Sequence, residues 1–175
     1  MADEERMAKD LYTAIAAKYP DATTFTRIAS SEQRHEERVL ALLDRYQLTH
    51  PSTTAGTYDD KDVQKLYNDW LAQAQTSESA AYQVGVDLEK ADVADLRTAI
   101  DTSDNADLDQ VYGHLLTASQ RHQAAFAAGP GATPALGPNG QGARNGQGAM
   151  NGQGMRNGQG AMNGQGLRNG SCLTN

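Results

Sequence analysis

The sequence predicts an all-α protein, built as one helical bundle with a repetitive tail. In the first 128 residues, apolar side chains recur at steps of three and four, which place them on one face of a helix, and no stretch alternates with the period of two typical of a strand. Residues 129–175 instead hold 14 of the 17 glycines and no acidic or aromatic residue. We therefore expect a bundle over residues 1–128 and a separate low-complexity tail over residues 129–175.

Two helices are expected before residue 50. The first is predicted from about Asp3 to Tyr19, because Pro20 cannot continue the hydrogen-bond ladder. The second is predicted from residues 22–24, where threonines can cap it, to about Leu48. Their inner rows are Glu5, Ala8, Tyr12, Ile15 and Tyr19, and then Phe25, Ile28, Glu32, His35, Val39, Leu42 and Tyr46.

Three more helices are expected after the turn-forming stretch THPSTTAGTYDD. The third, from Asp60 to about Gln75, has an apolar side around Trp70 without a polar residue, so we expect a purely structural role. The fourth begins at a Ser77 cap, and the fifth covers residues 106–127 after a cap at residue 103, 104 or 105. Their inner rows are Tyr82, Gly85, Glu89, Asp92, Leu96 and Ala99, and then Leu108, Tyr112, Leu115, Ser119, His122 and Phe126.

Four of the five inner rows contain carboxylates or imidazoles. These are Glu5, then Glu32 with His35, then Glu89 with Asp92, and finally His122. Burying unpaired carboxylates is costly, and two divalent cations would neutralise four of them with neutral imidazoles as further ligands. Because residues at i and i+3 share a helix face, Glu32 can bridge two ions while His35 completes the shell of one. The pattern therefore favours a metal site.

Each of these residues also has an ordinary explanation. Glu5 suits the first turn of a helix, and His122 suits a core histidine bonded to a carbonyl. Glu32 with His35 suits a solvated face, and Glu89 with Asp92 suits a wet edge. The metal hypothesis is favoured because all six lie on inner rows, whereas the other two histidines, at positions 50 and 114, lie off them and are expected to be exposed.

Charge and composition exclude several classes of function. The bundle carries all 22 acidic residues against 12 basic ones, so nucleic acid is not expected as a partner. No apolar run approaches the roughly 20 residues that span a bilayer, and MADEERMAKD lacks the basic-then-apolar order expected of a signal peptide. The compartment is expected to be extracellular if a signal has been removed, and the cytoplasm otherwise. The single cysteine, Cys172, permits no intramolecular disulfide and is either a bystander or a link between two chains.

From Asn139 the tail repeats a six-residue unit, NGQGAR NGQGAM NGQGMR. This composition is typical of a flexible tail, but stacked copies could also pair their backbones and align amide ladders. The alternative function is therefore a self-assembling structural, matrix or filament protein with a catalytically silent bundle. Oligomerisation is expected through the bundle, the tail or both. Met150, Met155 and Met162 with Cys172 are a weaker candidate site for Cu(I).

Several segments resemble the ferritin-like superfamily, in a rubrerythrin-related branch called domain of unknown function 2202. EERMAKDLY resembles its first-helix motif, FTRIASSEQRH its second, and VGVDLEKADVADL with VYGHLLTASQRHQAAF the last two helices, over about residues 3–128. The resemblance implies an antiparallel four-helix bundle with the Trp70 helix in the long crossover. It also implies a di-iron centre that reacts with oxygen or peroxide, with electrons from an external donor.

The sequence departs from that family pattern at one position. The last helix of a ferritin-like bundle carries Glu-x-x-His, but Ser119 stands three residues before His122. Asp92 is the candidate to replace the missing carboxylate. The expected cofactor is iron, as two ions or one, with manganese or zinc as alternatives.

Overall fold

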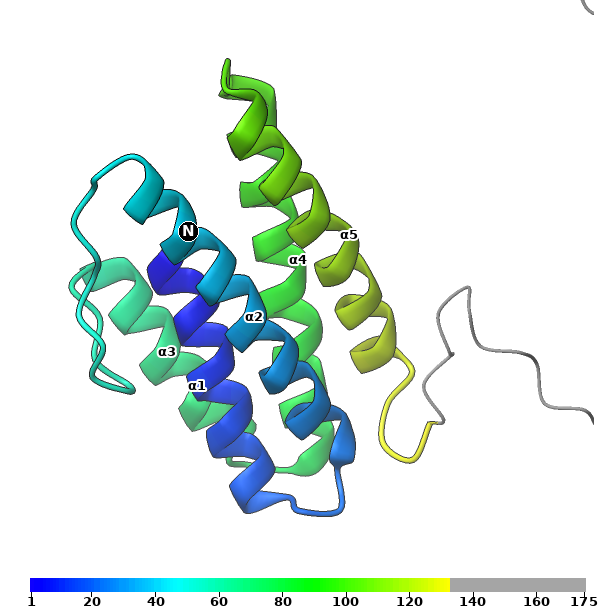
Figure 1. Ribbon diagram of the computed structural model, residues 1–175. Coiled ribbons are helices and arrows are strands. Elements are labelled where there is room, and N and C mark those ends of the chain that lie inside the picture. The colour runs from blue at the N-terminus through cyan, green and yellow to red at the C-terminus, as the bar shows by residue number, and fades with distance from the viewer. Residues whose placement is uncertain (133–175) are drawn as a thin grey trace, which may run out of the picture. The chain divides into compact units, whose positions relative to one another are not determined.

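The computed structural model describes residues 1–132, and within this range it contains five α-helices and no strand (Figure 1). The repeats from Asn139, the three tail methionines and Cys172 lie outside the described residues. The helices are α1 (Ala2–Lys18), α2 (Thr23–Arg45), α3 (Lys61–Ala74), α4 (Glu78–Thr102) and α5 (Ala106–Ala127). The all-α prediction is therefore confirmed for residues 1–132.

The caps of α4 and α5 agree with the prediction, Asp60 is the N-cap of α3 rather than its first residue, and α2 differs at both ends. Asp60, Ser77 and Asn105 each accept hydrogen bonds from the first free backbone N–H groups of α3, α4 and α5. The predicted threonine cap of α2 is wrong, because the N-cap is Ala22, which makes no side-chain hydrogen bond. The helix also ends three residues before Leu48, at a turn where Gln47 has a φ of 56°.

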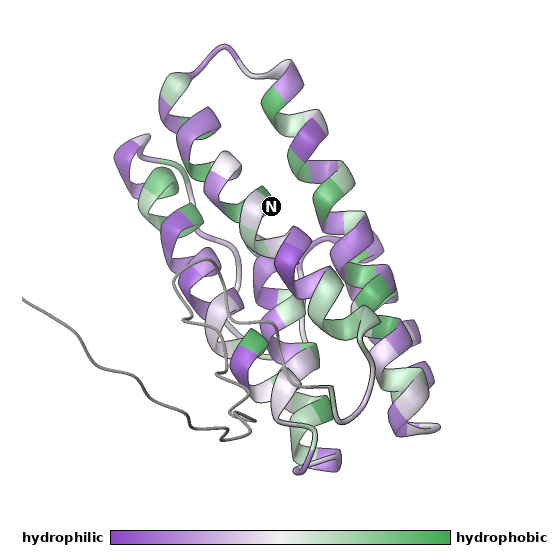
Figure 2. Ribbon diagram, turned by 90° about the vertical axis from the view of Figure 1, so that its right-hand side faces the viewer, coloured by the Kyte–Doolittle hydropathy of each residue, from purple (hydrophilic) through white to green (hydrophobic). Residues whose placement is uncertain are grey.

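The helices pack as two hairpins with α3 at the side. In Figure 1, α1 runs along α2 and α4 runs along α5, and the hairpins meet where α2 contacts α5 and α1 contacts α4. Helix α3 lies in the connection between the hairpins, against α1 and α4. Figure 2 shows hydrophilic and hydrophobic residues interspersed along the helices, as expected when apolar residues recur every three or four positions.

The apolar core has two parts, and the carboxylates and imidazoles lie between them. The larger part contains a cluster of aromatic rings, in which the ring centroid of Phe126 lies 4.9 Å from that of Tyr12 and 5.1 Å from that of Phe25. The smaller part contains Val39, Leu96 and Leu115. On α2, Glu32 and His35 come after Phe25 and before Val39, so the polar side chains form a layer between two apolar layers.

The long connection between α2 and α3 is held by a buried arginine. Arg6 is 2% exposed, donates to the carbonyls of Thr54 and Thr57 at 2.7 and 2.9 Å, and pairs with Asp3 at 2.9 Å. Its guanidinium also stacks over the ring of Tyr58. Through Arg6, the first turns of α1 are therefore joined to the connection between α2 and α3.

None of the helices in residues 1–132 combines the length and apolarity needed to cross a bilayer.

Candidate metal centre

Five of the six predicted ligands meet in one buried layer of the bundle. Glu5 comes from α1, Glu32 and His35 from α2, Glu89 from α4 and His122 from α5. The three glutamates and His35 are at most 2% exposed, and the side chain of His122 is 12% exposed. Side chains from four helices thus lie together in this layer.

Glu32 stands at the centre of this site and faces both histidines. Its Oε2 lies 2.8 Å from Nδ1 of His35, and its Oε1 lies 2.7 Å from Nδ1 of His122. The two imidazole rings are nearly parallel, with centroids 5.5 Å apart. The two oxygens of one carboxylate are therefore directed to two different ring nitrogens.

Two further glutamates complete two groups that share Glu32. Glu5 Oε2 lies 3.3 Å from Nδ1 of His35, and Glu89 Oε2 lies 3.6 Å from Nδ1 of His122. Within each group, one ligand atom per residue lies within 4.8 Å of the others. Each group holds two carboxylates and one imidazole, so the site has an approximate internal symmetry about Glu32.

Several polar atoms in the site have no aligned hydrogen-bond partner. They include Oε1 of Glu5, Oε1 of Glu32 and the Nδ1 atoms of His35 and His122. The histidine Nδ1 atoms thus lie close to the glutamate oxygens, but the angles between them are not those of a hydrogen bond. Buried polar groups are rarely left in this condition unless a ligand, ion or water satisfies them. The residues present consequently fit a metal cation, since imidazole nitrogens and carboxylate oxygens that converge without bonding one another are suitable ligands.

Burial and neighbouring charges set the protonation of these groups. Burial, reinforced by the charge of Glu32, raises the pKa of Glu5 to about 7 and that of Glu89 to about 8, while the nearby histidine opposes the rise in each case. Burial also opposes ionisation of Glu32, but His122 and His35 outweigh it and lower the pKa of that carboxyl. Against the effect of burial, the carboxylates raise the pKa of His35 to about 9 and that of His122 to about 10. Without metal, protons therefore provide the positive charge of the site.

Tyr12 supports the site from the aromatic cluster. Its hydroxyl donates a 2.8 Å hydrogen bond to Oε1 of Glu89, and its side chain is completely buried. Burial and the adjacent Glu89 raise the tyrosine pKa well above its ordinary value, so the hydroxyl remains a donor. The bond orients the Glu89 carboxylate and leaves its other oxygen directed toward His122.

The structure places Asp92 beside the two groups but in neither of them. Its side chain lines the same cavity as Glu5, Glu32 and Glu89, yet it is partly exposed. Burial and the charge of Glu5 raise its pKa, and Ser119 opposes the rise. Ser119 is completely buried and donates to the Leu115 carbonyl at 3.0 Å.

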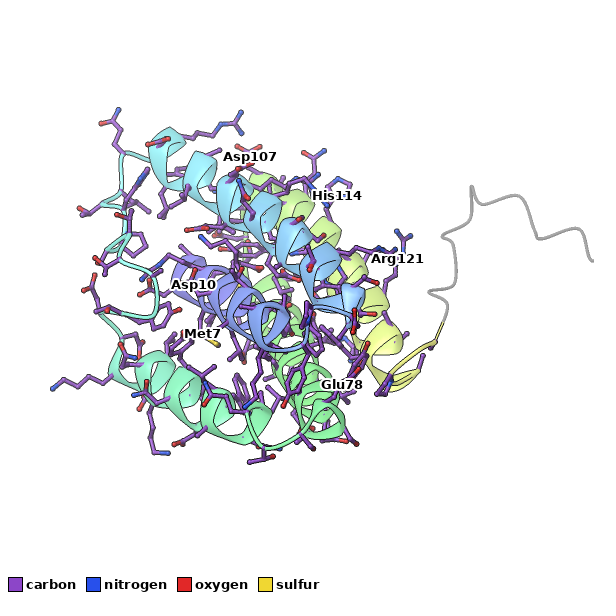
Figure 3. All side chains as sticks on the ribbon, turned by 90° about the horizontal axis from the view of Figure 1, so that it is seen from below. Met7, Asp10, Glu78, Asp107, His114 and Arg121 are labelled. Carbon is purple, nitrogen blue, oxygen red and sulfur yellow. The ribbon has the colours of Figure 1, made fainter. Side chains whose placement is uncertain are left out.

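The cavity beside the carboxylates involves a helix that we expected to be purely structural. Its volume is about 40 Å³, and its apolar walls include Met7, Leu66, Trp70 and Leu88. In Figure 3, Met7 points from α1 toward α3, which carries Leu66 and Trp70. The apolar stripe of α3 gave no signal of this role, because a residue that lines a cavity has the same spacing as one that packs in a core.

This geometry bears on two of the ordinary explanations. Glu5 does lie in the first turn of α1, but it is buried there, and Glu32 and His35 do not lie on a solvated face, because all three are at most 2% exposed. The remaining histidines are exposed as expected, and His50 pairs with Asp44 at 2.9 Å.

Comparisons with known proteins agree with the extent of the bundle. Residues 1–131 match the sequence model of a family described as "Uncharacterized protein domain (DUF2202)". "Uncharacterized protein MJ0754" of Methanocaldococcus jannaschii is 34% identical over 128 residues, which cover 72% of this chain and 69% of that protein. A crystal structure of the hypothetical protein MJ0754 is similar with a TM-score of 0.70, covering 72% of this chain and 73% of the other. With the family match extending over well more than half of its residues, the protein belongs to the DUF2202 family.

Proposed function

We propose that the bundle is a ferritin-like metalloprotein with a two-metal carboxylate centre, iron being the expected metal. The observation that carries this proposal is the position of Glu32, whose two oxygens face two different imidazoles. Ferritin-like di-iron sites use a Glu from each of two helices and Glu-x-x-His from each of the other two. Glu5, Glu89 and the pair Glu32–His35 follow that pattern, and His122 follows it without the carboxylate at position 119.

Each residue has a defined part in this proposal. Glu5, Glu32 and His35 would hold one ion, and Glu32, Glu89 and His122 would hold the other, so that Glu32 would be shared by both. Asp92 is the proposed reserve carboxylate, available through the shared cavity in place of the glutamate that Ser119 replaces. Tyr12 keeps the Glu89 carboxylate oriented.

The proposed activity is the reduction of dioxygen or peroxide, with an external electron donor as the molecule that is oxidised. Iron held by these ligands would supply the electrons for oxygen or peroxide reduction, and an external donor would restore them. The protein contributes the geometry, the apolar surroundings and the cavity beside the carboxylates. Met7, Leu66 and Trp70 form an apolar part of the walls of that cavity, opposite carboxylates such as Glu5 and Glu89, which suits the entry of a small, weakly polar molecule.

Metal content of site variants tests the proposal. The metal-free full chain would be reconstituted anaerobically with Fe(II), and in parallel with Mn(II) or Zn(II), and its metal content measured by elemental analysis. We expect about two ions per chain in the wild type, about one in His35→Ala and in His122→Ala, and none in Glu32→Ala. His114→Ala is the matched control, because it removes an exposed histidine from the same helix as His122.

The outcomes separate the alternatives. One ion in the wild type that is lost in only one histidine variant would indicate a single-metal site at that histidine. Equal metal content in the wild type and Glu32→Ala would refute a centre built around Glu32. Where metal is bound, oxygen consumption and peroxide turnover with a chemical reductant then test the oxidase or peroxidase activity.

A further inference from the structure

A polar groove lies between α2 and α5 next to the candidate metal centre. Its volume is about 460 Å³, and its walls include Arg27, Ser31 and Arg34 of α2 with Arg121 and His122 of α5. This volume is within the range of roughly 300–1,000 Å³ that is usual for small-molecule sites. No acidic side chain is among the residues that line it.

The three arginines of the groove form no ion pair or hydrogen bond with any part of residues 1–132. Arg27 and Arg34 are seven residues apart on α2, which places them on one side of the helix. In Figure 3, Arg121 projects outward from α5 where that helix runs beside α2. Arg6 and Arg45 each pair with an aspartate, whereas Arg38 and Arg97 also lack an ion pair within residues 1–132 but do not line the groove.

The groove differs from the rest of the domain in the charge of the residues that line it. The first 128 residues hold 22 acidic and 12 basic residues, so carboxylates are abundant. The three arginines place three positive charges along one groove that no acidic side chain lines. Guanidinium groups bind phosphate and carboxylate oxygens through paired N–H donors, and the Ser31 hydroxyl on the same wall is a further donor.

His122 connects this groove with the candidate metal centre. Its Nδ1 faces Glu32 and Glu89 inside the bundle, while the residue also lines the groove and its side chain remains 12% exposed. We propose that the groove binds a small molecule with two or more negatively charged oxyanion groups. Arg27, Arg34 and Arg121 hold these groups, and the part of the molecule next to them lies against His122. Binding of the anion does not depend on the proposed metal, whereas its action as a substrate of that metal does.

Titrations of the metal-free full chain test this inference. Pyrophosphate and citrate would be added at constant ionic strength, with binding followed by calorimetry and by backbone amide shifts in NMR spectra. We expect saturable binding, with shifts concentrated in residues 24–34 and 121–125. The anion that binds more tightly identifies phosphate or carboxylate as the preferred group.

Charge-matched variants establish whether the groove is responsible. Arg27→Gln with Arg121→Gln should weaken binding by tenfold or more, since each lost charged hydrogen bond is commonly worth about a tenfold change. Arg38→Gln with Arg97→Gln removes the same charge from two exposed arginines outside the groove and should change binding by less than about twofold.

Three results would overturn the inference. They are the absence of saturable binding by either anion, equal weakening in both double variants, and binding only of a long polyglutamate peptide, which would indicate an acidic protein partner instead. Metal uptake, measured on parallel samples of the same protein reconstituted with Fe(II), keeps the two proposals separate. Anion binding by a chain that takes up no metal would refute the metal centre alone, and metal uptake without anion binding would refute the groove alone.

Discussion

At the scale of single residues, the site depends on groups that are buried before any cation arrives. Glu32 remains ionised because His35 and His122 lie within 2.8 Å of its oxygens, while burial favours the neutral forms of Glu5 and Glu89. A cation entering the site must displace protons from the histidines and from these two glutamates. The bound metal and the protons are therefore alternatives at the same positions.

Tyr12→Phe tests the orienting hydrogen bond at this scale. The substitution removes the hydroxyl that donates to Glu89 and leaves the ring contact with Phe126 in place. We expect a loss of about 1 kcal/mol in the free energy of unfolding and a weakening of metal affinity of about 10- to 100-fold. Denaturant unfolding and competition with a metal-sensitive dye measure the two effects.

Tyr82→Phe is the matched control for Tyr12→Phe, because Tyr82 belongs to the same aromatic cluster but makes no hydrogen bond to a ligand within residues 1–132. Metal affinity that falls equally in both variants would assign the effect to the aromatic packing and contradict an orienting role for the Tyr12 hydroxyl.

At the scale of the helices, one close approach sets the distance between α4 and α5. A Cβ atom at Gly85 would lie 2.5 Å from the ring of Phe126, which is buried among other rings. Glycine is therefore required in α4 where α5 packs against its backbone, despite its low helix propensity. A larger residue would push α5, and His122 with it, away from Glu32.

The two helical glycines provide a paired prediction. Gly85→Ala should destabilise the protein by about 1–3 kcal/mol, because the ring cannot move without disturbing the core. Gly113→Ala should stabilise it by about 0.5–1 kcal/mol, since no atom lies within 4 Å of the added methyl group. Thermal unfolding of the metal-free variants measures both changes, and a destabilised Gly113→Ala with an unchanged Gly85→Ala would contradict this packing.

The crossover between α2 and α3 gives a second prediction at the scale of elements. Arg6→Met removes both hydrogen bonds to the carbonyls of Thr54 and Thr57 while keeping an apolar side chain of similar length. We expect a loss of about 2–3 kcal/mol in the free energy of unfolding, because partly buried carbonyls are left unpaired. Limited proteolysis should then cut the crossover earlier than in Arg45→Met, which removes an exposed pair.

At the scale of the whole molecule, stability without metal should depend on pH in a defined direction. Burial raises the pKa of Glu5 from 4.5 to about 7 and that of Glu89 from 4.5 to about 8. The contribution of these two groups to the free energy of unfolding is therefore complete below pH 4.5, and it is lost as the pH rises through about 8. Although burial opposes it, neighbouring carboxylates raise the pKa of His35 and His122 from 6.5 to about 9 and about 10, which extends the loss to higher pH. The lowered pKa of Glu32 acts in the opposite direction only below pH 4.5.

We therefore expect the Tm of the metal-free protein to fall between pH 6.5 and about 9, while the rise in Tm on addition of Mn(II) grows over the same interval. Differential scanning calorimetry with and without Mn(II) measures both trends. The variant Glu5→Gln, Glu89→Gln should show a weaker pH dependence without metal, because it removes two of the groups that titrate. A metal-free Tm that rises with pH across this interval would contradict the proposed protonation.

The sequence alone determined the helices and the inward faces of most of them. The spacing of three and four residues placed Glu5, Glu32 and Glu89 among apolar neighbours, and all three are buried. Cap residues such as Asp60 and Asn105 marked helix starts, because capping is a local interaction. The predicted inner row of α2 was wrong at its last residue, because Tyr46 lies beyond the end of the helix and is 39% exposed.

Only the tertiary structure decided which atoms meet. Helical periodicity defines the face of each helix but not the rotation and register of one helix against another, which depend on contacts such as Phe126 on Gly85. For that reason the sequence could not show that Glu32 faces both histidines, or that Asp92 lies outside both ligand groups. The cavity wall at Trp70 and the groove of unpaired arginines are likewise products of helix packing, because their residues come from helices far apart in the chain.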